Sequence, residues 1–306
     1  MHCVNLATFG PTTLLWSKSA DTTFMALAPT IVVTGATSGI GAGVVSALAG
    51  RAGRIIAVGR RCHDHDDGNV RWVHADITDS TGRQRVVTAG ENATVIVHCA
   101  GSCVRGAIEN LTEAQIRNVF EINIVAPLLL TKMLLPALRT NSGLVLAVGS
   151  LAGMIGSPGN SLYSASKFAL DGWLEAAAYE LAYVGVKSRI MVPLYAATDF
   201  MTTAASQEPL PAGAYAEFEI ATRQRLDTSL HGAPDANIVS AAIVDAIDDG
   251  LSGETMFNRI IIGNQDVLDR RITLGAAKWF DKFSSEITPW LQATPRHNGT
   301  DKLPLR

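Results

Sequence analysis

Charged residues are scarce in this sequence, and neither sign dominates. Lys, Arg, Asp and Glu make up 17% of the 306 residues, and the formal net charge is −3. A nucleic-acid-binding protein presents clustered basic residues to the phosphates, and no basic stripe is visible here. The composition therefore argues against nucleic acid as a partner. Because 47% of the residues are hydrophobic, the chain has enough apolar surface to build a large core.

Cysteine is also rare, and its pattern fits neither a disulfide framework nor a metal site. The four cysteines are Cys3, Cys62, Cys99 and Cys103. None of them forms a Cys-x-x-Cys pair. We expect reduced thiols in a cytoplasmic protein and no bound metal. Cys99 falls at the end of an apolar run, where a small core residue is expected.

Long apolar runs are absent as well, since no uninterrupted stretch approaches the roughly 18 residues that cross a bilayer. No transmembrane segment is therefore expected. The small residues at 26–28 resemble a signal cleavage site, but Lys18 and Asp21 interrupt the stretch before them. We expect residues 1–28 to form a poorly ordered or loosely docked extension, and residues 291–306 to form a C-terminal tail.

Short runs of β-branched and apolar residues alternate with longer helical patterns. The expected strands lie at 30–34, 54–59, 70–75, 94–98, 143–148, 187–192 and 259–262. Their near-continuous apolar character is typical of strands that helices cover on both faces. The alternation predicts one α/β domain over residues 29–290, with a parallel sheet and right-handed crossovers. We predict a doubly wound Rossmann-type sheet of about seven strands in three α/β/α layers.

Residues 195–230 break this alternation. The segment contains Pro209, Pro211 and Gly213, and its apolar residues show weak periodicity. A long insertion inside a compact domain is usually functional. We therefore predict a substrate-binding loop or lid in this segment.

A glycine-rich turn follows the first predicted strand, and a helical pattern begins at Gly39. Glycine allows a tight turn and lets a pyrophosphate approach the main chain, while the N-terminus of the following helix attracts the phosphate charge. The residues expected to bind a dinucleotide in this turn are Gly35, Thr37, Ser38, Gly39, Ile40 and Gly41. A purely structural turn is the alternative interpretation.

The end of the second predicted strand indicates which dinucleotide is favoured. Arg60 and Arg61 stand where an acidic residue would hold the ribose hydroxyls of NAD. A guanidinium forms paired hydrogen bonds with the 2′-phosphate of NADP, whereas a carboxylate would repel it. NADP(H) is therefore favoured, with Arg60 as the main candidate. Two arginines that are merely solvated are the alternative, and NAD(H) stays open.

A serine, a tyrosine and a lysine provide the candidate catalytic groups. Tyr163 and Lys167 are four residues apart in a helical segment, so they share one helix face. A nearby cation stabilises a phenolate and lowers its pKa, as a general acid/base requires. Ser150 follows the fifth predicted strand, at the carboxyl edge where parallel sheets bind ligands. Its hydroxyl is expected to hold a substrate oxygen against the phenol.

Asn123 belongs to a predicted helix over about residues 111–139. Thr112 and Gln115 have the spacing of a capping box at its start. Pro127 has no N–H, so the carbonyl of Asn123 loses its helical partner and becomes free to hold a water. A helix kink without chemical function is the alternative.

These motifs together resemble the short-chain dehydrogenase/reductase family, over about residues 30–263. The family's Thr-Gly-x-x-x-Gly-x-Gly motif is matched at Thr34, Gly35, Gly39 and Gly41. Its catalytic tetrad is matched in identity, order and spacing by Asn123, Ser150, Tyr163 and Lys167. The resemblance implies that Lys167 also binds the nicotinamide ribose, and that a water held by Asn123 serves a proton relay.

The resemblance implies further cofactor contacts. Asp76 would meet the adenine amino group with Ile77 packed beside it, although a helix cap is an alternative role for this acid. Ala100 and Gly101 would line the cofactor ribose. Pro193 and Thr198 match a motif that meets the nicotinamide.

The chain also departs from the family pattern at two places. His98 and Cys99 replace the usual pair of asparagines before Ala-Gly. Leu194 replaces the glycine that usually follows the proline, and its side chain is expected to narrow the space near the nicotinamide.

The sequence thus predicts an NADP(H)-dependent oxidoreductase that interconverts a carbonyl and a secondary alcohol, with Tyr163 as the general acid/base. Apolar residues after the serine and in the insertion suit a lipid-like, steroid-like or aromatic small-molecule substrate. They are Leu151, Met154, Ile155, Tyr195, Phe200, Met201, Leu210, Tyr215 and Phe218. Simple packing of the lid explains them equally well. The resemblance implies a homodimer or homotetramer formed through the helices that carry Asn123 and Tyr163.

Other classes of protein stay open. A non-catalytic dinucleotide-binding regulator of the same fold should lack the tyrosine or the lysine, and this chain keeps both. The glycine spacing and the short substrate region disfavour a nucleotide-sugar isomerase or dehydratase, and the tetrad disfavours a methyltransferase. The amphipathic stretch 278–283 is expected to pack in the core or between subunits, with membrane-surface contact as the alternative.

Overall fold

The centre of the molecule is one twisted sheet. The computed structural model describes residues 28–51, 53–194, 200, 209–230, 235–263 and 266–293. The strands are β1 (Thr30–Thr34), β2 (Arg54–Gly59), β3 (His65–Asp67), β4 (Val70–His74), β5 (Val95–His98), β6 (Leu144–Val148), β7 (Lys187–Pro193) and β8 (Phe257–Ile262). Their order is β3-β4-β2-β1-β5-β6-β7-β8. The predicted doubly wound α/β fold is confirmed, with each of the seven predicted strands in place.

The eighth strand, β3, was not predicted. It pairs antiparallel with β4 at the edge of the sheet, while every other neighbouring pair runs parallel. Its sequence, His65-Asp66-Asp67, is exposed throughout and has no apolar alternation that would mark a strand. Contacts with β4 define it instead, because the His65 ring stacks on Trp72 and Asp66 pairs with Arg71. A charged edge of this kind also discourages pairing with another chain.

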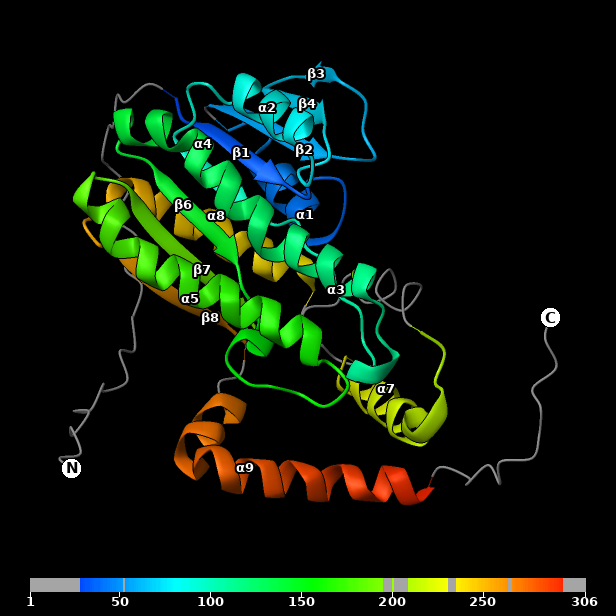
Figure 1. The fold of residues 1–306 in the computed structure, drawn as a ribbon. Helices are drawn as coiled ribbons and strands as arrows, with labels where there is room; N and C mark the ends of the chain where they lie inside the picture. The colour runs from blue at the N-terminus through cyan, green and yellow to red at the C-terminus, as the bar shows by residue number, and fades with distance from the viewer. Residues whose placement is uncertain are drawn as a thin grey trace.

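Helices cover both faces of the sheet, as Figure 1 shows. On one face lie α1 (Gly39–Leu48) and α8 (Ala236–Ser252), which pack against each other. On the other lie α2 (Ser80–Ala89), α4 (Ala126–Thr140) and α5 (Ser161–Tyr183). Each face therefore has its own buried apolar cluster, and the strands between the two clusters are apolar on both sides.

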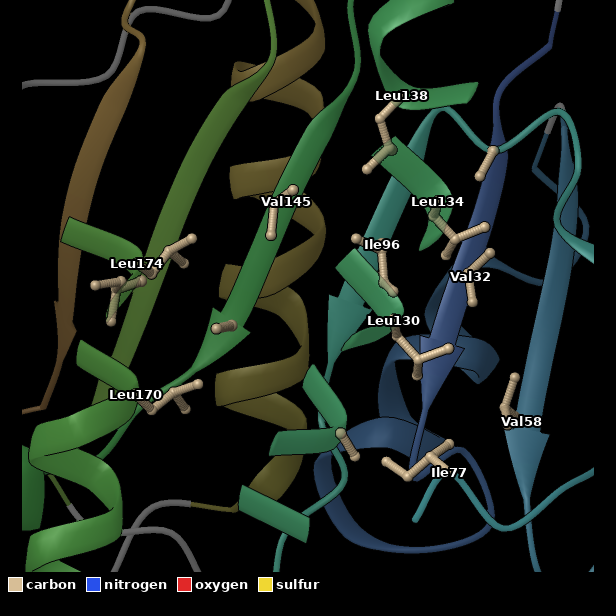
Figure 2. Close-up of a cluster of buried hydrophobic side chains, with 14 of the residues drawn as sticks. Val32, Val58, Ile77, Ile96, Leu130, Leu134, Leu138, Val145, Leu170 and Leu174 are labelled. Atoms are coloured by element: carbon tan, nitrogen blue, oxygen red, sulfur yellow. The ribbon is translucent and has the colours of Figure 1, made fainter. Parts of the chain in front are cut away.

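The helices of the second face contact the sheet through leucines at helical spacing. In Figure 2, Leu130, Leu134 and Leu138 of α4 lie over Val32 and Ile96. These five side chains are almost fully buried. Burying a leucine contributes roughly 1.5–3 kcal/mol relative to leaving it in water. Side chains at every fourth position thus fix the helix on the sheet.

The helix predicted over residues 111–139 has an interruption. The capping box of Thr112 and Gln115 is present at the start of α3 (Glu113–Phe120). A π-helical turn, η2 (Glu121–Val125), then separates α3 from α4. The Ala126 N–H donates to the Glu121 carbonyl five residues back, just before a proline that has no N–H to donate. The proline therefore accompanies a local widening of the helix.

The run from Glu113 to Thr140 is also long and apolar enough to cross a membrane, with a mean hydropathy of 1.6 in its most apolar window. A core helix of a folded domain passes the same test. Here the leucines of α4 face the sheet, so the apolar character of this run is accounted for by packing inside the domain.

Two helices lie beyond the ends of the strands. The short 3-10 turn η4 (Gly213–Tyr215) leads into α7 (Ala216–Leu230), and the long α9 (Asp266–Ala293) packs against α7. Figure 1 shows both on the side toward which the parallel strands point. The helix α7 was not predicted, because its apolar residues show weak periodicity. Polar contacts help to hold it in place: Glu219 accepts hydrogen bonds from the Ala107 N–H at 2.7 Å and from Asn110 at 3.1 Å.

The predicted terminal extension and most of the predicted tail lie outside the described residues. The structure describes the chain from residue 28, and α9 continues to Ala293, three residues into the segment expected to be a tail. Residues 195–199 and 201–208 of the predicted lid lie outside the described part as well.

Candidate active site

A cavity of about 470 Å³ lies at the carboxyl ends of the parallel strands. The segments that follow β1, β2, β4, β5, β6 and β7 all contribute to its lining. The connections out of β1 and β5 lead to opposite halves of the sheet. An open α/β sheet binds its ligand where the strand order reverses in this way. The topology therefore places the cavity where a dinucleotide is expected.

The glycine-rich turn forms one end of the cavity. Gly35 has a φ of +68°, in the left-handed region that favours glycine. A β-carbon at Gly41 would lie 2.3 Å from the carbonyl oxygen of Gly35. The first and last glycines of the motif are thus required by the turn itself, which folds the chain back onto the start of α1. The six residues predicted to bind in this turn all line the cavity: Gly35, Thr37, Ser38, Gly39, Ile40 and Gly41.

The N-terminus of α1 opens into the cavity as a ready anion site. Its first turn, Gly39–Ala42, carries no acidic side chain. The Ser38 hydroxyl does not cap the helix but accepts a hydrogen bond from Arg61 at 2.8 Å. The first backbone N–H groups of a helix lack intrahelical partners and attract negative charge. The guanidinium of Arg61 adds a full positive charge beside them.

Arg60 and Asp76 face each other across the same end of the cavity. Their side chains lie 3.5 Å apart, and both residues line the cavity together with Ile77. Partial burial raises the pKa of Asp76, but hydrogen bonds from the N–H and hydroxyl of Thr78 and the charge of Arg60 outweigh burial and hold this pKa below its ordinary value. Asp76 is therefore ionised, and Asp79 rather than Asp76 caps α2.

Asn123 lies behind the cavity wall and does not line it. Its side-chain oxygen accepts from the Ser102 N–H at 2.7 Å, and its amide donates to the Ser102 carbonyl at 2.8 Å and to Ser166 at 2.9 Å. The side chain thus ties the loop after β5 to the catalytic helix α5. This loop carries Ala100 and Gly101, which line the cavity as predicted from the resemblance.

Ser150, Tyr163 and Lys167 converge on the middle of the cavity. All three line it, and the Lys167 ammonium lies 5.7 Å from the centre of the Tyr163 ring. The ammonium donates to the Val148 carbonyl at the end of β6 at 2.8 Å. The Ser150 hydroxyl accepts from the Ala152 N–H at 3.1 Å and hydrogen-bonds to the tyrosine. The structure therefore brings together the three groups that the sequence predicted.

Burial dominates the pKa values of the tyrosine and the lysine. Burial raises the pKa of Tyr163 above its ordinary value, and the hydrogen bond with Ser150 offsets only part of that effect. Burial lowers the pKa of Lys167 to about 8. The expectation that Lys167 lowers the pKa of the phenol is therefore not met, because the loss of hydration dominates this pKa and the Lys167 ammonium donates to the Val148 carbonyl instead.

The two residues that depart from the family pattern at the end of β5 have different surroundings. His98 is buried, and its Nε2 lies 2.9 Å from the Thr131 hydroxyl of α4. Burial lowers its pKa to about 3, so the ring is neutral. Cys99 packs partly against the core, as expected, but it also lines the cavity. Burial raises the pKa of its thiol to about 12, which keeps the thiol protonated.

The last predicted cofactor segment is only partly described. Pro193 and Leu194 line the cavity, while Thr198 lies outside the described residues. Leu194 is buried and also joins the apolar core on the α5 side of the sheet. The substitution of glycine by leucine therefore adds a cavity wall that is continuous with the core.

Some of the predicted substrate contacts reach the cavity and some do not. Leu151, Ile155 and Phe200 line it, and the Phe200 ring lies 5.9 Å from that of Tyr163. Met154, Leu210, Tyr215 and Phe218 are not among the lining residues. Tyr195 and Met201 lie outside the described part of the chain.

Sequence reasoning missed several lining residues from distant segments. They are Ser102, Cys103, Asn118, Ile122, Asn160, Arg225 and Trp279. The sequence did mark Trp279 as part of the amphipathic stretch 278–283, but the prediction made from that stretch was core or subunit packing and not a place in the cavity wall. Nothing in the sequence of the other six sets them apart from ordinary surface or core residues.

Comparisons with known proteins agree with this geometry. A sequence model of the family described as short chain dehydrogenase matches residues 29–209. The chain is 29% identical over 187 residues to the ketoacyl reductase HetN of Nostoc sp., a match that covers 56% of this chain and 65% of that protein. It is 30% identical over 168 residues to a 3-ketodihydrosphingosine reductase of Bacteroides thetaiotaomicron, covering 53% and 62%. The matches thus span less than two thirds of either relative.

A solved structure extends the comparison over most of the chain. The short-chain dehydrogenase of Streptomyces avermitilis is 29% identical to this chain and superposes with a TM-score of 0.67. The superposition covers 87% of this chain and 96% of that one. The similarity therefore reaches well beyond the glycine turn and the catalytic helix.

Proposed function

Because this chain belongs to the short-chain dehydrogenase/reductase family, we propose that it is an NADP(H)-dependent oxidoreductase that interconverts a carbonyl and a secondary alcohol. The observation that carries the proposal is the convergence of Ser150, Tyr163 and Lys167 on one cavity whose other end is the glycine turn and the open N-terminus of α1. Both curated relatives are named as reductases of keto compounds.

The cavity has the features that a nicotinamide dinucleotide requires. The turn from Gly35 to Gly41 leaves the main chain approachable, and the N-terminus of α1 suits a pyrophosphate. Asp76 and Ile77 would hold the adenine end, and Lys167 the nicotinamide ribose. When bound, the cofactor supplies the hydride chemistry.

The residues of the chain would manage the proton and the substrate oxygen. In reduction, the Tyr163 hydroxyl donates its proton to the carbonyl oxygen as that oxygen gains charge. The Ser150 hydroxyl holds the same oxygen by a hydrogen bond. The raised pKa of Tyr163 keeps its proton in place until the substrate oxygen takes it. Lys167, held by the Val148 carbonyl, places a positive charge beside the phenol as the proton leaves. Oxidation runs these steps in reverse.

Two arginines favour NADP over NAD. Arg60 and Arg61 both line the cavity at its glycine end, and Arg61 is held to Ser38 at the N-terminus of α1. The one acidic side chain that Arg60 faces, Asp76, is already paired with it. A 2′-phosphate would therefore meet net positive charge at this end of the cavity.

The other end of the cavity favours an apolar substrate. Leu151, Ile155, Leu194 and Phe200 contribute apolar side chains to the cavity lining, and the Phe200 ring lies 5.9 Å from that of the catalytic tyrosine. A cavity lined in this way, with a hydroxyl pair at its centre, suits a lipid-like, steroid-like or aromatic ketone. The keto compounds in the names of the curated relatives are consistent with this class.

We also propose that two or four copies assemble through α5, which carries Tyr163, and the helical run Glu113–Thr140, which carries Asn123. Phe168, Tyr179 and Tyr183 are exposed and lie on one face of α5, since they are 11 and 4 residues apart. Burial of these rings between copies would explain an aromatic stripe on the exposed face of this helix. Light scattering of the purified protein tests the assembly. A cytoplasmic location stays our expectation.

The proposed activity is tested by cofactor titration followed by a ketone panel. NADPH binding is measured by its fluorescence and compared with NADH under the same conditions. We expect tighter binding of NADPH, and NADPH oxidation with at least one apolar ketone. Equal or tighter binding of NADH would overturn the assignment of NADP, and binding without turnover of any ketone or alcohol would favour a regulatory protein.

A further inference from the structure

The C-terminal helix α9 contributes a side chain to the cavity although it lies far beyond residues 29–209, which match the family model. Trp279 lines the cavity together with Ile155, Leu194 and Phe200. Its indole is partly buried, whereas Phe280, the next residue, is 70% exposed and Ile272 is 71% exposed. The helix thus presents one aromatic ring to the cavity and other apolar side chains to solvent.

The start of α9 is fixed to the wall of the cavity. Leu268 is buried in the same apolar cluster as Leu194. The Leu194 N–H donates to the Ile262 carbonyl at the end of β8 at 3.0 Å. Gly263 follows with a φ of +122°, and a β-carbon there would lie 3.3 Å from the Leu194 side chain. Gly263 therefore lies close against the Leu194 side chain just after β8.

Like Leu268, Trp279 contacts the apolar cluster that contains Leu194, about three turns further along α9. Leu268 and Trp279 are 11 residues apart, so they lie on the same face of α9, and Trp279 also packs against the cluster that contains Leu194. Elsewhere along its length α9 packs against α7, as Figure 1 shows. The indole therefore lies at the part of the cavity wall to which Leu194 also belongs.

We propose that Trp279 is a specificity-determining residue whose indole forms the outer apolar wall of the substrate site. This inference rests on the proposed oxidoreductase function and names the part of the substrate that is recognised. The reacting carbonyl lies at Ser150 and Tyr163, and the wall acts on the apolar body of a bulky or long ketone. A short ketone that fills only the space near Tyr163 has no contact with the indole.

The test compares two substrates and two variants. With a long apolar ketone, Trp279→Ala is expected to raise KM about tenfold while kcat changes less than about threefold, because uniform binding is lost and the chemical step is untouched. With a short aliphatic ketone both constants are expected to stay within about twofold of the wild type. Phe280→Ala removes a ring from the exposed side of the same helix, so it should behave as the wild type with both ketones.

Two further measurements keep the outcome clear. NADPH titration reports whether the cofactor end is intact in Trp279→Ala, and equal affinity is expected. Trp279→Phe keeps an aromatic ring and should retain most of the affinity for the long ketone. The same variant should lose the part of the intrinsic fluorescence quenching that the long ketone causes in the wild type, which does not depend on turnover.

The results separate this inference from the proposed function. If the wild type turns over no ketone, the proposed function fails. If the wild type turns over both ketones and Trp279→Ala leaves KM for the long ketone unchanged, the wall is elsewhere and this inference is wrong. An equal rise in KM for both ketones would also overturn it, because the effect would then not follow the length of the substrate.

Discussion

The two ends of the cavity are built in different ways. The cofactor end consists largely of main chain: a glycine turn, the N-terminus of α1 and the loop after β5, with arginines added at its rim. The substrate end consists of side chains from segments far apart in the sequence, such as Ile155, Phe200 and Trp279. Only the first kind of site leaves a compact motif in the sequence, because backbone geometry restricts the residues at fixed positions.

The difference also predicts how each end responds to change. A main-chain cradle tolerates few substitutions at its glycines, since an added side chain occupies the space of the backbone. An apolar wall tolerates substitution, but a substitution there changes which ligand binds. The catalytic tyrosine lies between the two ends, and removal of its hydroxyl alone should leave both kinds of binding intact.

The largest expected effect is on the chemistry between the two ends. Tyr163→Phe removes the proton donor but keeps the ring, so kcat should fall by roughly 10²–10⁴-fold. The affinity for NADPH, measured by fluorescence titration, should stay the same because the phosphates bind elsewhere. Tyr179→Phe is the matched control, since its hydroxyl lies on the 81% exposed side chain of the same helix. Retained turnover in Tyr163→Phe would remove this residue from its role.

The next effect concerns the main-chain cradle. In Gly41→Ala the new methyl would lie 2.3 Å from the Gly35 carbonyl oxygen, so the turn must shift. Overpacking of this kind costs about 1–3 kcal/mol, which corresponds to roughly 5–150-fold weaker NADPH binding if the shift falls on the phosphate site. Gly172→Ala on α5 meets no atom within 4 Å and should leave NADPH affinity unchanged. Equal affinities for both variants would mean that the cradle is not the phosphate site.

A third prediction is that His98, at the end of β5, makes the stability of the folded protein depend on pH. The pKa of His98 is about 3 in the folded protein and near 6.5 when unfolded, so between these values the unfolded chain binds the extra proton. Stability is therefore lost as pH falls below 6.5, by about 2 kcal/mol between pH 7 and pH 5.

Denaturant unfolding at both pH values checks this loss. His98→Asn cannot take up the proton, so its stability should fall by about 2 kcal/mol less than that of the wild type over the same interval. The replacement is expected to cost stability at pH 7, because the contact with Thr131 changes. Only the change with pH tests the histidine, and parallel curves for the two proteins would contradict the prediction.

The smallest effect concerns the rim of the cofactor end. Arg61→Ala removes a guanidinium beside the N-terminus of α1, and we expect NADPH to bind about tenfold more weakly while NADH is unaffected. Arg51→Ala, whose side chain pairs with Asp248 away from the cavity, serves as the control. An equal loss for NADPH and NADH would place Arg61 at the shared pyrophosphate instead.

The sequence allowed much of this architecture to be predicted. The seven parallel strands follow from apolar runs, and only β3 was missed because its polar residues resemble a loop. The capping box at Thr112 was predicted, whereas the π turn at Glu121–Val125 was not, since it depends on how the widened helix packs. Ser150 could be located because it follows a predicted strand, and Tyr163 and Lys167 because they share one helix face. Asn123 came from the family resemblance, and it does not line the cavity.

Local sequence therefore determined which segments form strands, where the glycine turn lies and that Tyr163 and Lys167 share a helix face. Each of these features depends on neighbours within a few residues. Tertiary structure alone decided that Asn123 ties Ser102 to Ser166, that burial raises the pKa of Tyr163, and that Trp279 reaches the cavity. Hydration and contact are properties of the folded interior, and segments that are distant in sequence create them only when they meet.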